Sequence, residues 1–235
     1  MIHVGCCGFP VKRADYYAAM PVAEVQKTFY QPPRPATAAR WRDEAPEGFE
    51  FTLKAWQLIT HTARSPTYRR LSESLSQKEK RQVGRFRWSD PVRRAWDRTR
   101  EIARLLAAEK VVFQCPAGFR PTGENLDRLR AFFERIDRGG LVCIWEPRGA
   151  WTRDEIRTLC DELDLVHCGD PLTAPSVTPG LRYWRLHGTT GYRHRYTDKE
   201  LDALLASCPK TLDTYLMFNN MSMFEDARRL REKAG

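Results

Sequence analysis

Arg182-Tyr183-Trp184-Arg185-Leu186-His187-Gly188 is the stretch of this chain that decides its fold. The stretch alternates as a buried strand does. Tyr183, Arg185 and His187 share one face, Trp184 and Leu186 share the other, and a glycine ends the pattern. One face of the strand is therefore polar. A polar interior face with a histidine at the carboxyl end is typical of barrels, in which interior side chains meet a site at the C-terminal mouth.

Similar patterns recur along the chain and predict eight strands, with helices after seven of them. Thr152 and Thr197 are expected to cap two of these helices, and the link 171–180 has no helical pattern. Because alternating strands and helices imply a parallel sheet, we predict an α/β fold, a single (β/α)8 TIM-type barrel over residues 1–235. The alternative is an open doubly wound sheet, but no phosphate-binding glycine loop supports it. The predicted strands are 3–9, 24–30, 50–56, 110–115, 141–146, 165–170, 182–188 and 212–219.

The composition is that of an ordinary globular protein, with 42% hydrophobic and 29% charged residues. No apolar run of about 18 residues occurs, and the chain starts directly in a strand pattern, so we expect a cytoplasmic protein with no membrane partner. The oligomeric state stays open. The seven cysteines include no CxxC pair, which argues against a zinc ribbon. In a reducing cytosol they are expected to be buried free thiols.

Polar or ionisable groups end seven of the eight predicted strands. Because catalytic groups of this fold collect at the C-terminal ends of the strands, these positions form the candidate site. Glu146, Asp170 and His187 are the candidate catalytic residues, as acid, base or metal ligands. The candidate substrate-binding residues, which include cations for an anion, are Lys54, His61, Gln114, Arg148, Arg185, Tyr192, Asn219 and Asn220.

A structural role is the main alternative for the charged residues inside the barrel. Glu24, Lys54, Arg185 and Glu146 would then pair with one another, since a buried charge needs a partner.

The chemistry at the mouth also has alternatives. The sequence identifies no cofactor, and it leaves open whether a divalent metal is bound. Five histidines are too few for a three-zinc cluster. The carboxylates Glu146 and Asp170 on neighbouring strands would also fit a glycosidase, whose carboxylate spacing the sequence does not give.

Much of the net charge of +9 lies in a long insertion after the third strand, at about 57–90. Between Arg64 and Arg94 there are ten lysine or arginine residues and three aspartate or glutamate residues. The aromatic residues of this stretch have no periodic element to bury them, so we expect some to be exposed beside the cations, as on a nucleic-acid surface. A solvated basic face is the alternative. The candidate nucleic-acid-binding residues are Arg69, Arg70, Arg85, Arg87, Trp88, Arg193 and Arg195.

Several motifs, spread in order over almost the whole chain, resemble those of the DUF72 family, also called YecE-like. The resemblance implies a TIM-type barrel and no established activity; a structural likeness of some members to endonuclease IV implies DNA binding at the family level. The double cysteine and the Gln-Cys-Pro form resemble an archaeal-type branch, whereas Gln26 and Gly149 stand where the family commonly has asparagine and histidine. The motifs are Gly5 to Phe9, Glu24 to Gln26, Thr28 to Tyr30, Phe51 to Ala55, Thr60-His61, Phe113-Gln114, Glu146 with Arg148 and Trp151, Tyr183 to Gly188, Tyr192, and Phe218 to Asn220.

The sequence thus leaves two hypotheses of function. The first is an enzyme, a hydrolase of the phosphodiesterase or nuclease kind, acting on an anionic or phosphate-bearing small molecule at the mouth. The second is a nucleic-acid-binding protein without catalysis, in which the barrel is a scaffold for a basic, aromatic rim.

Overall fold

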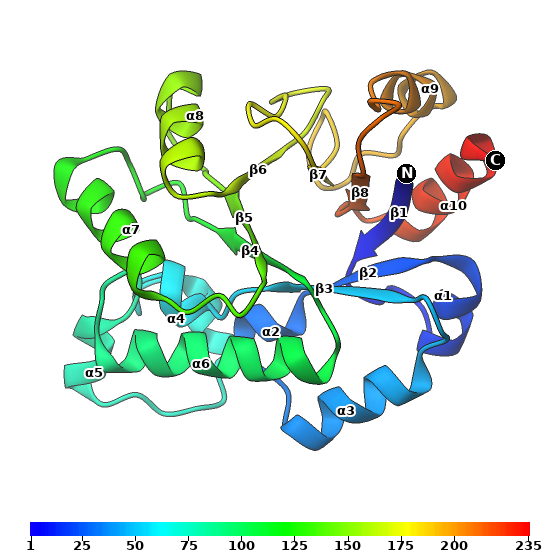
Figure 1. Ribbon diagram of the computed structural model, residues 1–235. Helices are drawn as coiled ribbons and strands as arrows, with labels where there is room; N and C mark the ends of the chain where they lie inside the picture. The colour runs from blue at the N-terminus through cyan, green and yellow to red at the C-terminus, as the bar shows by residue number, and fades with distance from the viewer.

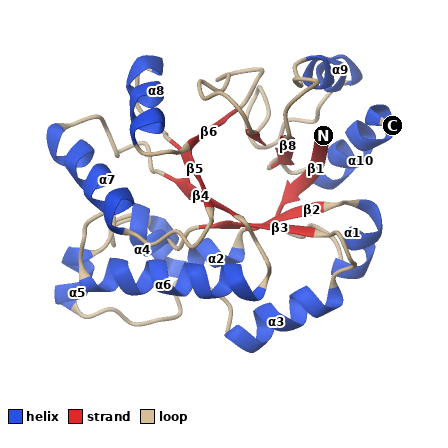
Figure 2. Ribbon diagram, in the orientation of Figure 1, coloured by secondary structure: helices blue, strands red, loops and turns tan.

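The computed structural model describes residues 1–235 and contains a closed barrel of eight parallel strands in sequential order, β1 to β8. Each strand pairs with the next, and β8 pairs with β1, so the sheet has no free edge. Figure 2 shows the strands as a central ring with helices outside it. The predicted barrel is confirmed. The strands are β1 (Ile2–Cys7), β2 (Val22–Val25), β3 (Glu50–Lys54), β4 (Lys110–Gln114), β5 (Val142–Glu146), β6 (Val166–Gly169), β7 (Arg182–Leu186) and β8 (Thr214–Phe218).

Helices cover the outside of the barrel, and the two chain ends lie close together where α10 packs beside β1 (Figure 1). Thr152 and Thr197 form the expected N-caps, each within a capping box. No helix connects β6 to β7, as predicted. The helices are α1 (Arg13–Ala19), α2 (Lys27–Tyr30), α3 (Pro35–Glu44), α4 (Gln57–Thr60), the 3-10 helix η1 (Pro66–Arg70), α5 (Gln77–Gln82), α6 (Asp90–Leu105), α7 (Gly123–Arg135), α8 (Arg153–Glu162), α9 (Asp198–Ala206) and α10 (Met223–Ala234).

Two apolar clusters hold the barrel together, one on each face of the sheet. The larger lies between the strands and the helices and contains Cys6, Trp184 and Leu186. The smaller fills the barrel interior and contains Cys7 and Tyr183. Neighbouring strand residues therefore face opposite sides, which is the alternation that the sequence predicts. All seven cysteines are free thiols, and six of them are buried.

The second strand differs from its prediction. Residues 24–30 were expected to form one strand, but β2 ends at Val25 and Gln26 already has a helical backbone conformation, with φ −68° and ψ −27°. The Thr28 hydroxyl lies 2.6 Å from the Val25 carbonyl oxygen and 2.7 Å from that of Lys54. The buried hydroxyl therefore has hydrogen-bond partners although Thr28 is not part of a strand. The alternation of polar and apolar residues in 24–30 therefore extends beyond the strand by chance. The helical turn that follows is too short to show a helical period in the sequence.

The segment 57–90 is partly helical, with α4, η1 and α5 along it. Some of the aromatic residues in this segment were expected to be exposed, but Phe86 is fully buried and packs against Phe119, Phe132 and other aromatic side chains. Nonlocal packing buries it, which a search for local periodicity does not detect. Trp88 remains 36% exposed.

No helix of the structure is both long enough and apolar enough to span a bilayer.

Candidate functional site

Two cavities open at the C-terminal ends of the strands. The first, here called the axial cavity, has a volume of about 780 Å³ and lies over the barrel interior. The second, the side cavity, has a volume of about 410 Å³ and lies beside β5, β6 and β7 under the link between β6 and β7. Arg185 and His187 line both, so these two residues lie where the cavities meet. The axial cavity is lined by Cys7, Gln26, Tyr30, Lys54, Arg70, Gln114, Arg148, Arg185, His187, Gly191, Tyr192, Asn219 and Met223.

A buried ionic network occupies the floor of the site. Arg185 projects inward from β7 and its Nε lies 3.0 Å from Glu24 Oε2, while its Nη1 lies 2.5 Å from Glu146 Oε2. The Tyr183 hydroxyl donates to the same Glu24 oxygen over 3.0 Å. Arg185 is 2% exposed and Glu24 is fully buried. The structural pairing that the sequence left open is therefore present for Glu24, Arg185 and Glu146.

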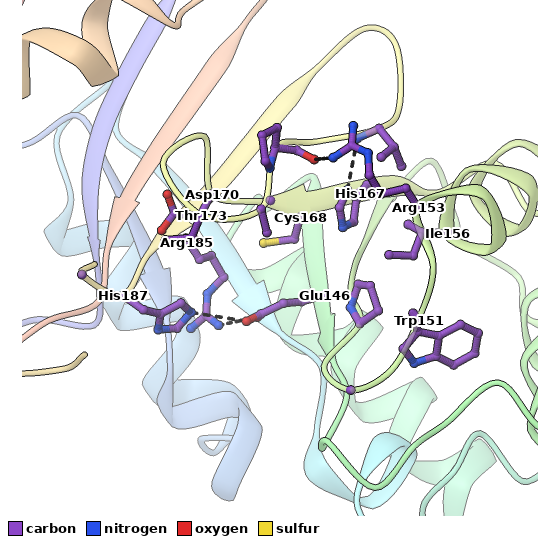
Figure 3. Close-up of a pocket in the computed structure, with 17 residues that line it drawn as sticks. Glu146, Trp151, Arg153, Ile156, His167, Cys168, Asp170, Thr173, Arg185 and His187 are labelled. Atoms are coloured by element: carbon purple, nitrogen blue, oxygen red, sulfur yellow. Dashed lines mark hydrogen bonds and ion pairs between the residues drawn. The ribbon is translucent and has the colours of Figure 1, made fainter. Parts of the chain in front are cut away.

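Glu146 is bound on its remaining oxygen as well. Arg148 approaches Glu146 Oε1 to 2.7 Å. His187 Nε2 lies 3.3 Å from the same atom (Figure 3). Burial alone would raise the pKa of Glu146, but the charges of Arg185 and Arg148 and the hydrogen bond from His187 hold that pKa well below its usual range. Glu146 therefore stays ionised, and both of its oxygens have hydrogen-bond partners. It is better placed to orient Arg148 and His187 than to act as a proton donor.

His187 is the most accessible member of this group, with a side chain that is 34% exposed. Its Nε2 lies 2.9 Å from Arg148 Nη2, and its Nδ1 lies 3.1 Å from the Asn219 side-chain amide. Both ring nitrogens therefore have polar neighbours, and the tautomer follows from how the Asn219 amide is turned. The ring faces both cavities, where it can exchange a proton with a ligand in either.

Asp170 lines the side cavity together with Glu146 and His187. Burial raises the pKa of Asp170, while the backbone N–H of Leu172, which donates to Oδ1 over 3.0 Å, acts against the rise. A carboxyl group with a raised pKa in a cavity is the kind of group that can serve as a general acid. The three candidate catalytic residues thus share one cavity, and His187 is the only one of the three that is not buried.

Lys54 differs from Arg148 and Arg185 because no carboxylate pairs with it. Its ammonium donates to Gln114 Oε1, and its Nζ lies 3.9 Å from the centre of the Phe29 ring. The residue is only 4% exposed. Burial, with the positive charge of Arg185, lowers the pKa of Lys54 to about 7, although Glu24 and Glu146 act in the opposite direction. The expected pairing of Lys54 with a carboxylate is therefore not seen.

The other candidate substrate-binding residues divide between the axial cavity and the surrounding core. Gln114, Tyr192 and Asn219 line the axial cavity. His61 is buried and lines neither cavity; its Nδ1 lies 2.8 Å from the Thr60 hydroxyl, and burial lowers its pKa to about 4. Asn220 is fully buried and donates to Asp226 Oδ2 over 2.7 Å, so it ties β8 to α10.

The candidate nucleic-acid-binding residues lie in two separate regions. Arg87 donates to the Val83 carbonyl oxygen, and Trp88 lies near Phe132 of α7 with Arg93 and Arg135 over its ring. The second region includes Arg70, which lines the axial cavity and lies 3.5 Å from the centre of the Tyr30 ring. Arg69, Arg193 and Arg195 are exposed, and the last two follow the cavity-lining residue Tyr192. Figure 1 places α7, which Trp88 approaches, and the loop before α9 on different sides of the barrel.

No three histidine, cysteine, aspartate or glutamate side chains converge as a group that could hold a metal ion.

Sequence reasoning missed three features of the site. Gln26 and Cys7 line the axial cavity, and Arg70, assigned to the basic insertion, reaches the cavity through its contact with Tyr30. Cys7 ends a strand with its side chain inside the barrel, so the face alternation of β1 contained the signal for it. Arg70 had no such signal, because its position depends on how η1 packs.

Comparisons with known proteins agree with this architecture. A DUF72 family protein from Thermotoga maritima superposes with a TM-score of 0.74 at 18% identity, over 100% of this chain and 99% of that chain. A DUF72 family protein from Enterococcus faecalis gives 0.73 at 18% identity, over 100% and 97%. A D-tagatose 3-epimerase-like protein gives 0.58 at 12% identity, over 99% and 95%. At these identities the likeness shows the fold alone.

No curated protein matches the chain. The model of the family described as "Protein of unknown function DUF72" matches residues 11–235, which is nearly the whole sequence. The chain therefore belongs to the DUF72 family.

Proposed function

We propose that the protein is an enzyme that binds a small anionic substrate, such as a phosphate ester, in the axial cavity. One observation carries the proposal: Lys54, Arg70, Arg148 and Arg185 line this cavity, and no aspartate or glutamate does. Arg185 is neutralised by Glu24 and Glu146 beneath it, but Lys54 and Arg70 have no carboxylate partner among the ion pairs. A buried cation without a partner favours an anionic ligand that supplies one.

Acid–base chemistry on a ligand in the axial cavity falls to His187, and Asp170 lies in the adjoining side cavity. His187 lines both cavities, and Asp170 has a raised pKa for a physical reason, its burial. Glu146 then acts as a positioning residue that fixes Arg148 and His187. Hydrolysis remains the reaction class that we propose for this site, because a phosphate ester needs charge stabilisation by cations and a proton for its leaving group.

The binding step is tested by calorimetric titration with glycerol phosphate, using glycerol as the neutral comparison. Arg148→Gln and Arg70→Gln are each expected to weaken binding by about 10-fold or more, because each removes a charged hydrogen-bond donor. Arg157→Gln is the matched control, since Arg157 pairs only with Asp154 on the outside of α8. Unchanged affinity in both cavity variants, or equal binding of glycerol, would contradict the proposal.

A nucleic-acid-binding role is the second candidate, favoured by the exposed Arg69, Arg193 and Arg195, which are close in sequence to the cavity-lining residues Arg70 and Tyr192. If this rim binds single-stranded DNA, the Arg193→Ala, Arg195→Ala double variant should bind more weakly. The slope of log affinity against log salt should also flatten by about 0.7 per lost phosphate contact. The Arg85→Ala, Arg87→Ala double variant measures in the same way whether the region near Trp88 contributes to DNA binding. If the parent and the Arg193→Ala, Arg195→Ala variant bind DNA equally in filter-binding assays across a salt series, these arginines do not bind nucleic acid.

A further inference from the structure

The three cations of the axial cavity other than Lys54 are all arginines, and two of them have carboxylate partners. Arg185 contacts Glu24 and Glu146, and Arg148 contacts Glu146. Lys54 is the one amine of the cavity, and its only hydrogen-bond partner is the neutral amide of Gln114. An amine that is buried without a counterion, and that borders an open cavity, is placed to act as a nucleophile.

The charged groups that face Lys54 come from four directions. Arg185 of β7 and Arg148 after β5 disfavour its ammonium form, while Glu24 of β2 and Glu146 of β5 favour it. His61, after α4, lies near enough for Lys54 to lower the pKa of its ring. With burial as the largest influence, the pKa of Lys54 falls to about 7, and a substantial share of the side chain is a neutral amine at neutral pH.

We propose that Lys54 is a catalytic nucleophile that forms an iminium with a small anionic aldehyde or ketone held in the axial cavity. The inference rests on the proposed function, because the same cations would hold the anionic part of the substrate. It shares the anion site with that function and differs from it in the reacting group, which is a carbonyl carbon and not a phosphate ester.

The step balances without a further reactant. The Nζ lone pair forms a bond to the carbonyl carbon, and the resulting carbinolamine loses its oxygen as water together with the two amine hydrogens. Protonation of the imine nitrogen gives an iminium ion at the place that the ammonium group occupied. Its positive charge is favoured by Glu24 and Glu146, as the charge of the ammonium form is. The Arg70 and Arg148 side chains line the cavity wall, where each can contact the anion.

Pyridoxal phosphate is a suitable probe because it joins an aldehyde to a phosphate. The full-length protein is incubated with it, reduced with borohydride, digested and mapped by mass spectrometry. At about pH 7 the modification of Lys54 is expected to be about 10-fold or more faster than that of exposed lysines, whose amines are almost fully protonated there. The rate at Lys54 should rise with pH and level off above about pH 8, because its pKa is about 7.

Lys110 is the matched control, since it is also buried but forms an ion pair of 2.7 Å with Glu50 at the other end of the barrel. Lys110→Arg should leave the modification of Lys54 unchanged, and Lys54→Arg, which keeps the charge, should abolish the fast reaction. Modification confined to exposed lysines, or an equal fast reaction in Lys54→Arg, would overturn the inference.

Inorganic phosphate separates this inference from the proposed function. If both are right, phosphate slows the reaction at Lys54 by competing for the cations. Fast modification without protection by phosphate would support the nucleophile and contradict the anion site. Calorimetric binding of phosphate by the parent protein, with no fast modification of Lys54, would support the anion site and overturn the nucleophile.

Discussion

Replacing Arg185 with methionine is expected to lower the free energy of unfolding by about 3 to 5 kcal/mol at neutral pH. The change leaves two buried carboxylates, Glu24 and Glu146, without the guanidinium that contacts both. Urea unfolding followed by circular dichroism measures the loss. The matched control is Arg182→Met on the same strand, because Arg182 contacts only backbone carbonyl oxygens and should cost about 0.5 to 2 kcal/mol.

The deficit of Arg185→Met should shrink as the pH falls from about 7 to about 4. In the parent, the depressed pKa of Glu146 makes its contribution to stability fully present above the unfolded value of about 4.3, and acid removes it. In the variant, burial without the Arg185 charge raises the carboxylate pKa values, so the native state takes up protons and gains relative stability in acid. A deficit below about 1 kcal/mol at neutral pH, or one that grows in acid, would contradict the network account.

Lys54→Met is expected to have the opposite effect and raise the free energy of unfolding by about 1 to 3 kcal/mol at about pH 6. The native pKa of Lys54 is lowered to about 7, so below that pH folding must bury an ammonium ion without a carboxylate partner. Between about pH 7 and pH 10.4 the native state releases this proton before the unfolded chain does. The stability of the parent therefore rises with pH, and the advantage of the variant should disappear.

Urea midpoints of parent and variant at about pH 6 and about pH 9 give this measurement. Lys110→Met is the control, because it removes the partner of Glu50 and should destabilise the protein at both values. A Lys54→Met variant that is less stable than the parent at about pH 6 would show that the ammonium ion is well accommodated, and the account of Lys54 would be wrong.

Periodicity predicts the barrel because its strands are buried on both faces and the helices are amphipathic. In the stretch Arg182 to Gly188, the alternation of polar and apolar residues distinguishes the interior face of the strand from its exterior face. Periodicity fails where an element is shorter than its own repeat. The single turn Lys27–Tyr30 imitated a strand, and Phe86 sits in a segment whose burial depends on residues more than 30 positions away.

The candidate site was predictable to the extent that it follows strand ends. Glu146, His187 and Lys54 come together because parallel strands deliver their C-terminal residues to one end of the barrel. The hydrogen-bond and ion-pair partners of these side chains were not predictable, because they depend on strand register and side-chain packing. Arg185 takes both available carboxylates and leaves Lys54 with an amide, and Arg70 reaches the cavity from a surface helix. The same limit applies to Asn220, which follows β8 but binds Asp226 of α10.

An anomalous difference map from crystals soaked in tungstate, a heavy oxyanion shaped like phosphate, tests the central claim most directly. The account predicts a peak in the axial cavity within hydrogen-bond reach of Lys54 Nζ and of the Arg148 or Arg70 guanidinium. Soaked crystals of Arg148→Gln should show a weaker peak there. Tungstate bound at other surfaces, with the axial cavity containing none, would contradict the account.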